Sequence, residues 1–266
     1  MELSKTKSAV YSSLSSKKMR QKHRLFLAEG EKCVLDTLGA FELEALIVSE
    51  DWLLGNPQIA EEYVGKILTA SPSAINKITT LVSPPEVIAV FQLPEDNVSA
   101  YDVSKDKLYL MLDGIQDPGN LGTIIRTADW FGIDTIFASK DTVDVFNPKV
   151  VQSTMGSLKR VKVIYTDLMD VISSNPEMPV YGMLLEGNNI YESGLDSTHG
   201  FIIMGNEGNG ISESLRGKIS HPLLIPPYNA ASHPESLNVA IATAITLSFF
   251  RSKSPATSNK QTTTDN

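Results

Sequence analysis

Three loops in the second half of the chain carry residues whose types and spacing could do chemistry. The first runs from Asn120 to Arg126 after a Gly/Pro turn, so Asn120 can cap the helix that follows and Arg126 falls in its second turn. The neighbours of Arg126 are largely apolar, and a guanidinium there is costly unless it is paired or emerges at a site. Two interpretations stay open: a functional arginine, or one that snorkels to solvent.

The second loop is rich in glycine. It consists of Gly205, Asn206, Glu207, Gly208, Asn209 and Gly210. Its glycines let the backbone approach a ligand closely, and Glu207 places a carboxylate on the loop. Two nucleotide-binding patterns are excluded, because Ile211 stands where a Walker A loop needs Lys and Glu213 stands where a dinucleotide fingerprint needs Gly. The alternative is a plain turn between a strand and a helix.

The third loop begins at Ile225-Pro226 and ends at Ser236-Leu237-Asn238, ahead of an apolar helical run. Ser236 is the expected N-cap of that helix. Asn238 then lies too far inside to be the cap, so its amide needs another partner. Plain capping of the last helix is the other interpretation.

The elements that must position these loops alternate between apolar strands and helices. This rhythm predicts a parallel sheet covered on both faces, with ligands bound beyond the carboxyl ends of the strands. Strands are predicted at 108–112, 135–138, 161–165, 180–185, 201–204 and 223–225. Helices are predicted from the first loop to about residue 131 and at 149–158, 168–173, 212–216 and 236–250.

The first half predicts a smaller α/β unit, followed by a polar linker at 92–102. Its expected elements are a helical lead over 1–24, strands at 24–30, 43–48 and 87–91, and helices at 31–38 and 75–81. The expected domains are 1–100 and 107–252, with a Ser/Thr/Lys-rich disordered tail at 253–266.

The three loops together resemble the SpoU class of the SPOUT RNA methyltransferases. The motifs that carry the resemblance are Asn120-x-Gly-x-x-x-Arg126, Gly205-Asn-Glu-Gly-x-Gly210, and Ile225-Pro with Ser236-Leu-Asn238. The match covers roughly residues 108–250, although the glycine expected soon after Ile-Pro is missing. The first half is similar to the ribosomal-protein-like RNA-binding domain often found ahead of SpoU catalytic domains. That similarity lies in Phe26-Leu-Ala-Glu-Gly30 and in the stretch that ends Val87-Ile-Ala-Val90.

The resemblance implies a fold, a cofactor and a reaction. The C-terminal parallel-sheet domain would carry a deep trefoil knot, bind S-adenosyl-methionine and form a homodimer whose active sites are completed at the interface. The reaction would be methyl transfer to a ribose 2′-hydroxyl of RNA, with ribosomal RNA expected first and transfer RNA second. A non-catalytic RNA-binding protein with a degenerate knot is the alternative, and the intact motif residues count against it.

Residue roles also follow from the resemblance. Arg126 would first grip the target phosphate and orient the ribose, and would act as general base only second, because free arginine holds its proton to above about pH 12. Glu207 would fix the cofactor loop or pair with Arg126. The residues expected to orient Arg126 and the hydroxyl are Asn120, Ser236 and Asn238. The residues expected to hold the cofactor are Gly205, Asn206, Gly208, Ile225 and Leu237.

The charged residues are unevenly distributed along the chain. The 266 residues carry a net charge of −8, yet the first 25 hold seven Lys or Arg against the single acid Glu2. This basic segment is either an RNA contact or a solvated helix.

The one cysteine, Cys33, excludes an internal disulfide and a cysteine-based zinc cluster, and no metal is expected. With no apolar run long enough for a bilayer and no signal peptide, a cytoplasmic protein without membrane contact is expected.

Overall fold

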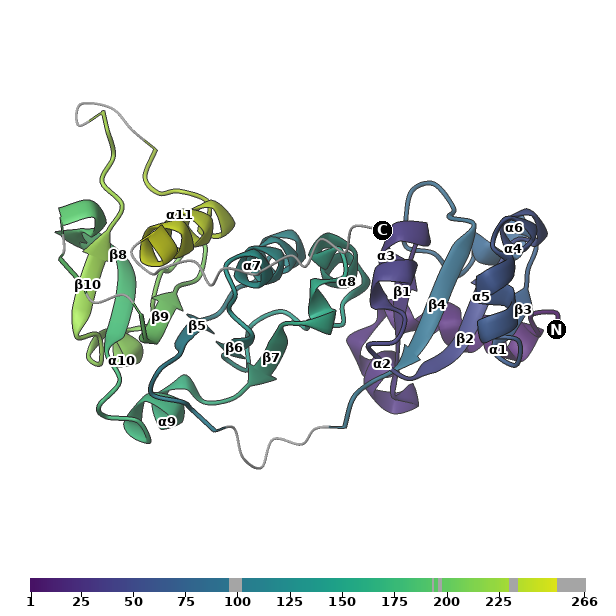
Figure 1. Cartoon of the computed structure of the whole chain (residues 1–266), viewed down its shortest axis with the longest axis horizontal. Coiled ribbons are helices and arrows are strands. Elements are labelled where there is room, and N and C mark those ends of the chain that lie inside the picture. The colour runs from purple at the N-terminus through teal and green to yellow at the C-terminus, as the bar shows by residue number, and fades with distance from the viewer. Residues whose placement is uncertain (96–101, 193, 196–197, 230–233, 253–266) are drawn as a thin grey trace, which may run out of the picture.

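The computed structural model describes residues 1–95, 102–192, 194–195, 198–229 and 234–252 (Figure 1). The chain folds into two α/β domains that lie side by side, each around its own sheet. The predicted fold class, a parallel-sheet domain preceded by a smaller α/β domain, is confirmed. The predicted tail at 253–266 lies outside the described residues. No helix within these ranges is long and apolar enough to cross a membrane.

The C-terminal domain is built on six strands in the order β10-β8-β9-β5-β6-β7, all paired in parallel. They are β5 (Leu108–Leu112), β6 (Thr135–Ala138), β7 (Lys162–Tyr165), β8 (Val180–Asn189), β9 (Gly200–Met204) and β10 (His221–Leu224). β5 and β9 are buried along their whole length, which explains their unbroken apolar sequence. Because all six strands run the same way, the loops after them meet at one edge of the sheet.

Side chains of the central strands alternate between two cores. In β5, the leucines face one core, while Tyr109 and Met111 face the other. The first core is covered by α7 and α11 and the second by α9 and α10 (Figure 1). The helices of this domain are α7 (Pro118–Trp130), α8 (Pro148–Thr154), η2 (Ser157–Lys159), α9 (Leu168–Ser173), η3 (Ile190–Glu192), α10 (Glu213–Arg216) and α11 (Val239–Ser252).

Helix α7 begins at Pro118 because Asp117 is its N-cap. The Asp117 carboxylate accepts a hydrogen bond from the backbone N of Asn120 at 2.8 Å, and a proline suits the first helical position. The prediction that Asn120 caps this helix is therefore wrong. Arg126 consequently lies in the third turn of α7 and not in the second.

Helix α11 begins at Val239 because Asn238 is its N-cap. The Asn238 Oδ1 accepts hydrogen bonds from the backbone N of Ala240 at 2.9 Å and of Ile241 at 3.3 Å. The predicted cap, Ser236, lies outside the helix. Serine and asparagine are equally good caps, so spacing alone could not choose between them.

The N-terminal sheet has the order β1-β4-β2-β3, and only β2 and β3 pair in parallel. Its strands are β1 (Leu25–Glu29), β2 (Leu43–Val48), β3 (Ile67–Thr69) and β4 (Val87–Gln92). Its helices are α1 (Lys5–Ser12), η1 (Ser13–Ser15), α2 (Lys17–His23), α3 (Glu31–Thr37), α4 (Glu50–Gly55), α5 (Pro57–Glu62) and α6 (Pro72–Ile75). The short elements α4, α5 and β3 were not predicted, because helices of six residues and a strand of three show too little periodicity.

The helix predicted over 75–81 is wrong. α6 ends at Ile75, and the backbone beyond it turns toward the buried carboxylate of Glu29. That carboxylate accepts hydrogen bonds from the backbone N of Thr80 at 2.9 Å, from the Thr80 hydroxyl at 2.6 Å and from the Thr79 hydroxyl. The Thr80 N–H is therefore not available for a helical hydrogen bond.

The basic lead segment packs onto the N-terminal sheet as α1 and α2, joined by η1. Tyr11 and Leu14 are buried in the core formed with Leu27 and Ile47. A wholly solvated helix is therefore wrong for this segment. Its lysines, Lys5, Lys7, Lys17, Lys18 and Lys22, are exposed on the outer side.

A buried ion pair joins the two domains. Arg20 of α2 is 2% exposed, and it donates to the Asp144 carboxylate from Nη2 at 2.6 Å and from Nε at 3.2 Å. Its Nη1 donates to the carbonyl oxygens of Leu14 and Ser15. The guanidinium is thus hydrogen-bonded on all its nitrogens, as a buried arginine needs to be.

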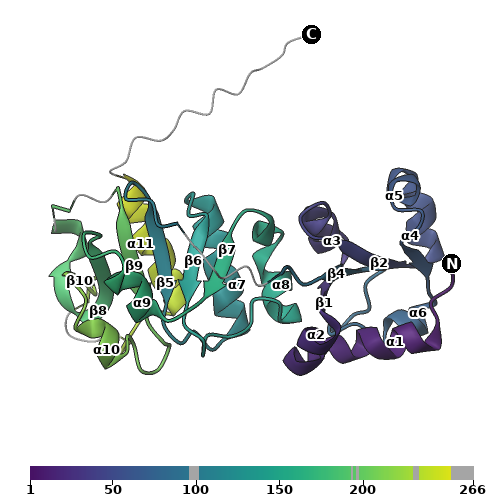
Figure 2. The same cartoon turned by 90° about the horizontal axis from the view of Figure 1, so that it is seen from below.

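Apolar contacts complete the interface between the domains. The ring of Phe146 lies 4.7 Å from the ring of Phe26, and Val151 of α8 belongs to the N-terminal core. Figure 2 shows α8 against the N-terminal domain, where its contacts are with β1. The ion pair and the aromatic contact fix the orientation of one domain against the other.

Replacing Arg20 by Met should destabilise the protein by about 3 kcal/mol, because the partly buried Asp144 carboxylate loses its cation. Urea unfolding followed by fluorescence measures this loss. Trp52 reports on the N-terminal domain and Trp130 on the C-terminal domain, so the variant should also separate the two transitions.

Arg160→Met is the matched control. Arg160 pairs with Asp129 at the same 2.6 Å, but this arginine is mostly exposed, so its loss should cost less than about 1 kcal/mol. Equal losses in the two variants would contradict a special role for the ion pair between the domains.

Candidate active site

The three loops predicted from the sequence meet at the carboxyl edge of the C-terminal sheet. The Asn238 Nδ2 donates to the Asn120 Oδ1 at 2.9 Å, and the Asn120 Nδ2 donates to the Glu207 Oε1 at 3.0 Å. One side chain from each loop therefore takes part in a continuous hydrogen-bonded row. The Asn238 amide, which needed a partner beyond its own helix, has one here.

Glu207 is the acceptor at the end of this row. Its carboxylate also accepts hydrogen bonds from the backbone N of Gln116 at 3.1 Å and of Asp117 at 3.2 Å. Burial alone would raise the pKa of Glu207, but the hydrogen bonds from Asn120 and from these backbone groups outweigh it and hold the pKa below its usual value. A charged carboxylate thus ties the glycine-rich loop to the start of α7.

Asn206 holds the glycine-rich loop in shape. Its Nδ2 donates to the carbonyl of Gly114 at 2.6 Å, and its Oδ1 accepts from the backbone N of Gly208 at 2.9 Å and of Asn209 at 3.0 Å. The backbones of Asn206 and Gly210 also bond to each other. Both ends of the Asn206 amide are therefore used inside the protein.

A cavity of about 590 Å³ opens beside this row. Its wall contains Glu207 and Ser236 as well as every residue that the sequence predicted for a cofactor. Those residues are Gly205, Asn206, Gly208, Ile225 and Leu237. Asn120 and Asn238 do not line the cavity. Asn120 bonds to Glu207 and Asn238 bonds to Asn120, so both residues support the cavity wall from outside the cavity.

Apart from residues in or directly beside the three loops, sequence reasoning missed two parts of the cavity wall, residues 183–186 of β8 and Arg216 of α10. The Arg216 Nε donates to the carbonyl of Ile211 at 2.9 Å, which holds this arginine along the glycine-rich loop. Its place on the short helix that follows that loop could have pointed to it. The β8 segment has no polar motif, so nothing in the sequence marked it.

Arg126 lies on the exposed face of α7 and does not line the cavity. Its neighbours Ile124 and Ile125 are buried in the core, so the helical period turns Arg126 toward solvent. Across the described ranges its guanidinium has no hydrogen-bond or ion-pair partner. The expected alternative of a Glu207–Arg126 pair is therefore not formed here.

Comparison with known proteins identifies the family. A family model described as the SpoU rRNA Methylase family matches residues 107–248. The chain belongs to this family. A model described as an MRM3-like substrate binding domain matches residues 9–89. The predicted family, and with it the predicted class of enzyme, is confirmed.

Several relatives resemble this SpoU-family chain along most of its length. It is 32% identical over 241 residues to RlmP of Bacillus subtilis, a 23S rRNA guanosine 2′-O-methyltransferase, with 90% of this chain and 93% of that one covered. A structure from Porphyromonas gingivalis, assigned to the TrmH family of RNA methyltransferases, has a TM-score of 0.82 and 35% identity, covering 96% of this chain and 100% of its own. An AdoMet-bound rRNA methyltransferase from Sinorhizobium meliloti has a TM-score of 0.81 and 30% identity, covering 95% and 97%. Its bound cofactor agrees with the predicted one.

The cavity fits S-adenosyl-methionine in size and in the chemistry of its wall. Its volume lies in the usual range for small-molecule sites. Ile225, Leu237 and Val239 offer an apolar surface suited to adenine, and the loop backbone offers polar groups. At Gly205 an added Cβ would lie 2.3 Å from the backbone C of Gly210, so only glycine allows this closely packed loop. In the described part of the chain, no group of three or more His, Cys, Asp or Glu could hold a metal ion.

Replacing Gly205 by Ala should weaken S-adenosyl-methionine binding by roughly tenfold or more, because the new Cβ collides with backbone that cannot yield. Titration calorimetry measures the affinity. Gly217→Ala is the control, since Gly217 does not line the cavity and its Cβ would meet only the carbonyl oxygen of Ser214 at 3.8 Å, an ordinary contact. Equal losses at the two positions would show that the packing at Gly205 does not shape the cofactor site.

Proposed function

We propose that this chain transfers the methyl group of S-adenosyl-methionine to a ribose 2′-hydroxyl of ribosomal RNA. The observation that carries the proposal is the hydrogen-bonded row from Asn238 through Asn120 to Glu207 beside a cavity of about 590 Å³. Two relatives that match nearly the whole chain support the substrate, RlmP acting on 23S rRNA and the Sinorhizobium meliloti rRNA methyltransferase.

When bound, S-adenosyl-methionine supplies a sulfonium methyl that is already electrophilic, so no metal or acid is needed for the leaving group. The task of the chain is to hold the cofactor and align the hydroxyl with it. Gly205, Gly208, Ile225 and Leu237 would hold it, while Asn206 and Glu207 keep the loop in position. The Ser236 hydroxyl on the cavity wall would orient the ribose.

Arg126 would grip the phosphate beside the target nucleotide and orient its ribose. Its exposed guanidinium, which has no partner elsewhere in the described ranges, offers the forked donors that bind phosphate in bidentate fashion. Removal of the hydroxyl proton would be its second role, for which the guanidinium must first lose a proton of its own; an RNA phosphate can accept the hydroxyl proton instead. Asn120 and Asn238 fix the start of α7, and with it the helix that carries Arg126.

Arg126→Ala should abolish methyl transfer while S-adenosyl-methionine binding survives, because the residue lies outside the cavity. Tritium transfer to RNA and calorimetry measure the two properties. Arg126→Lys separates phosphate binding from orientation of the ribose, because lysine keeps the positive charge and loses the forked donors of arginine. RNA affinity should therefore recover in this variant, whereas turnover should not. Full turnover in the Ala variant would remove Arg126 from catalysis.

The division of labour between the domains belongs to the same proposal. Residues 1–100 would bind the RNA and residues 107–252 would carry out the transfer. The deep trefoil knot expected from the resemblance would form the cofactor loops, and it stays a prediction. The cytoplasm is the proposed place of action.

We further propose a homodimer that forms through the outer side of α7 and α11. Trp130 is 86% exposed there and Ile241 53% exposed, and such large apolar groups are typical of protein interfaces. Arg126 shares α7 with Trp130, so a partner seated on this side would lie next to the catalytic arginine. This agrees with the expectation that each active site is completed at the interface.

Ile241→Glu should convert the dimer to a monomer, because a carboxylate would be buried in an apolar contact. Size-exclusion chromatography with light scattering measures the mass. Leu54→Glu is the control, since Leu54 is also an exposed aliphatic residue, 82% exposed, but lies on α4 of the other domain. A dimer that persists in the Ile241 variant would rule out this face.

A further inference from the structure

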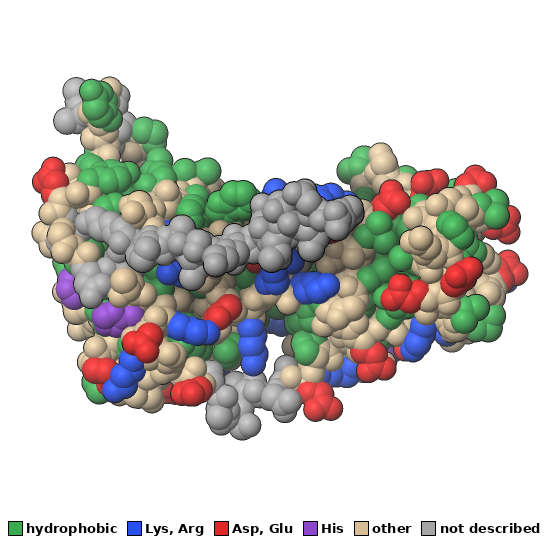
Figure 3. All heavy atoms as spheres, viewed as in Figure 1, with side chains coloured by type: hydrophobic (Ala, Val, Ile, Leu, Met, Phe, Trp, Pro, Cys, Tyr) green, Lys and Arg blue, Asp and Glu red, His purple; other side chains and the backbone are tan. Residues whose placement is uncertain are grey.

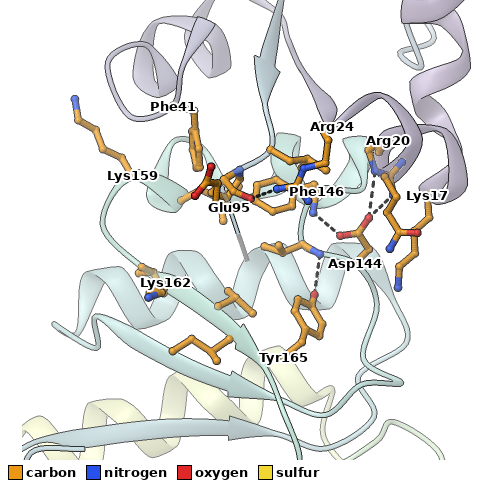
Figure 4. Close-up of a pocket in the computed structure, with 18 of the residues that line it drawn as sticks. Lys17, Arg20, Arg24, Phe41, Glu95, Asp144, Phe146, Lys159, Lys162 and Tyr165 are labelled. Atoms are coloured by element: carbon orange, nitrogen blue, oxygen red, sulfur yellow. Dashed lines mark hydrogen bonds and ion pairs between the residues drawn. The ribbon is translucent and has the colours of Figure 1, made fainter. Parts of the chain in front are cut away.

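A second cavity, of about 540 Å³, lies between the two domains and is lined by both (Figure 4). Lys17 and Arg24 come from the N-terminal side, and Lys159 and Lys162 from the C-terminal side. It is separate from the cofactor cavity, with which it shares no lining residue. The pair of Arg20 and Asp144 forms part of its wall, so the contact that joins the domains also shapes the cleft.

The cleft is strongly basic, although the chain as a whole is acidic. Seven Lys or Arg side chains line the cleft, and the acidic residues in its lining are Glu95 and Asp144. Arg20 pairs with Asp144 and neutralises it. The whole chain, in contrast, has a net charge of −8. In Figure 3, Lys and Arg side chains gather along the boundary between the domains, and Asp and Glu gather over the far side of the N-terminal domain. This contrast favours a polyanion at the boundary.

Four of these cations are available to a ligand. Lys17, Lys140, Lys159 and Lys162 are exposed, and their ammonium groups have no hydrogen-bond or ion-pair partner among the residues that the structure describes. Arg160, in contrast, is held by Asp129. The cleft therefore presents unpaired positive charge on rim positions of both domains.

The cleft also has an apolar and aromatic floor. Phe41 and Phe146 are half-buried in its wall with their rings 6.0 Å apart, and Leu93 and Val163 lie beside them. A duplex presents mainly phosphates to a protein, whereas unpaired bases can stack on aromatic rings. Charge with an aromatic floor therefore suits a single strand better than a duplex.

One end of the cleft reaches the edge of the sheet that carries the candidate active site. Lys140 and Asp144 lie on the loop after β6, and the Gln116 Nε2 donates to the carbonyl of Asp141 in that loop at 2.8 Å. The backbone N of the same Gln116 donates to Glu207. A strand lying in the cleft can therefore continue along this edge toward the active site.

We propose that the cleft between the domains binds the sugar-phosphate backbone of an unpaired RNA segment that flanks the methylated nucleotide. This inference rests on the proposed function and adds the path by which the RNA crosses from one domain to the other. Lys140, Lys159 and Lys162 contact the phosphates, and Phe41 and Phe146 receive the bases.

The test compares two triple variants of the full chain with the wild type. The cleft variant carries Lys140→Ala, Lys159→Ala and Lys162→Ala. The matched control carries Lys66→Ala, Lys77→Ala and Lys218→Ala, three exposed lysines outside the cleft, so both variants lose equal charge. Fluorescence anisotropy measures the binding of a labelled 12-nucleotide oligouridine across a series of KCl concentrations.

The cleft variant should bind roughly tenfold more weakly at low salt. The slope of log K against log salt should fall by about 2, because each phosphate that a lysine no longer neutralises removes about 0.7 from the slope. The control should keep the wild-type slope. Equal falls in both variants, or an unchanged slope in the cleft variant, would overturn the proposal. An RNA duplex whose slope falls by the same amount would overturn the assignment of an unpaired strand.

Calorimetry with S-adenosyl-homocysteine keeps this result distinct from the proposed function. Both variants should bind it as the wild type does, because none of the six lysines lines the cofactor cavity. A wild type that binds no S-adenosyl-homocysteine would count against methyl transfer, while a reduced salt slope in the cleft variant would still support RNA in the cleft.

Discussion

The Glu207 carboxylate is the contact on which the arrangement of the site depends. It accepts backbone hydrogen bonds from the loop before α7 and a side-chain hydrogen bond from Asn120, which is in turn bonded to the cap of α11. A loop with three glycines has many accessible conformations, and a charged acceptor with several donors selects one of them. The two helices that cover one face of the sheet thereby start from one fixed point, and the cofactor cavity opens beside it.

The general plan of this domain could be predicted from sequence because its signals are local. Unbroken apolar strands separated by helices indicate a parallel sheet, and each of the three loops follows one of those strands. The starts of α7 and α11 were harder to predict. Asp117 and Asn120 are both good N-caps for α7, and Ser236 and Asn238 are both good N-caps for α11. Only the tertiary contacts decide between them. The part of the cavity wall that comes from β8 could not be predicted from the sequence, because these residues reach the site only through the order of the strands in the sheet.

The N-terminal domain was predicted less well for a related reason. Glu29 is a carboxylate on a strand that is otherwise apolar, and nothing local shows that it will bind the backbone at Thr80 and stop a helix there. The interface between the domains is similar, since Arg20 and Asp144 are 124 positions apart. In the sequence Arg20 is one of several basic residues of the lead segment, and the fold makes it the one that is buried.

The row of amides that supports the site has a consequence for the order in which the protein is made. Asn120 and Asn238 are 118 positions apart, and Asn238 caps the last described helix of the domain. A nascent chain can complete its N-terminal sheet while this helix is still to be translated, yet Asn120 has no partner from α11 until then. A product truncated before Val239 would keep the N-terminal sheet and lack α11, so the hydrogen-bonded row beside the cavity is complete only once this helix has been made.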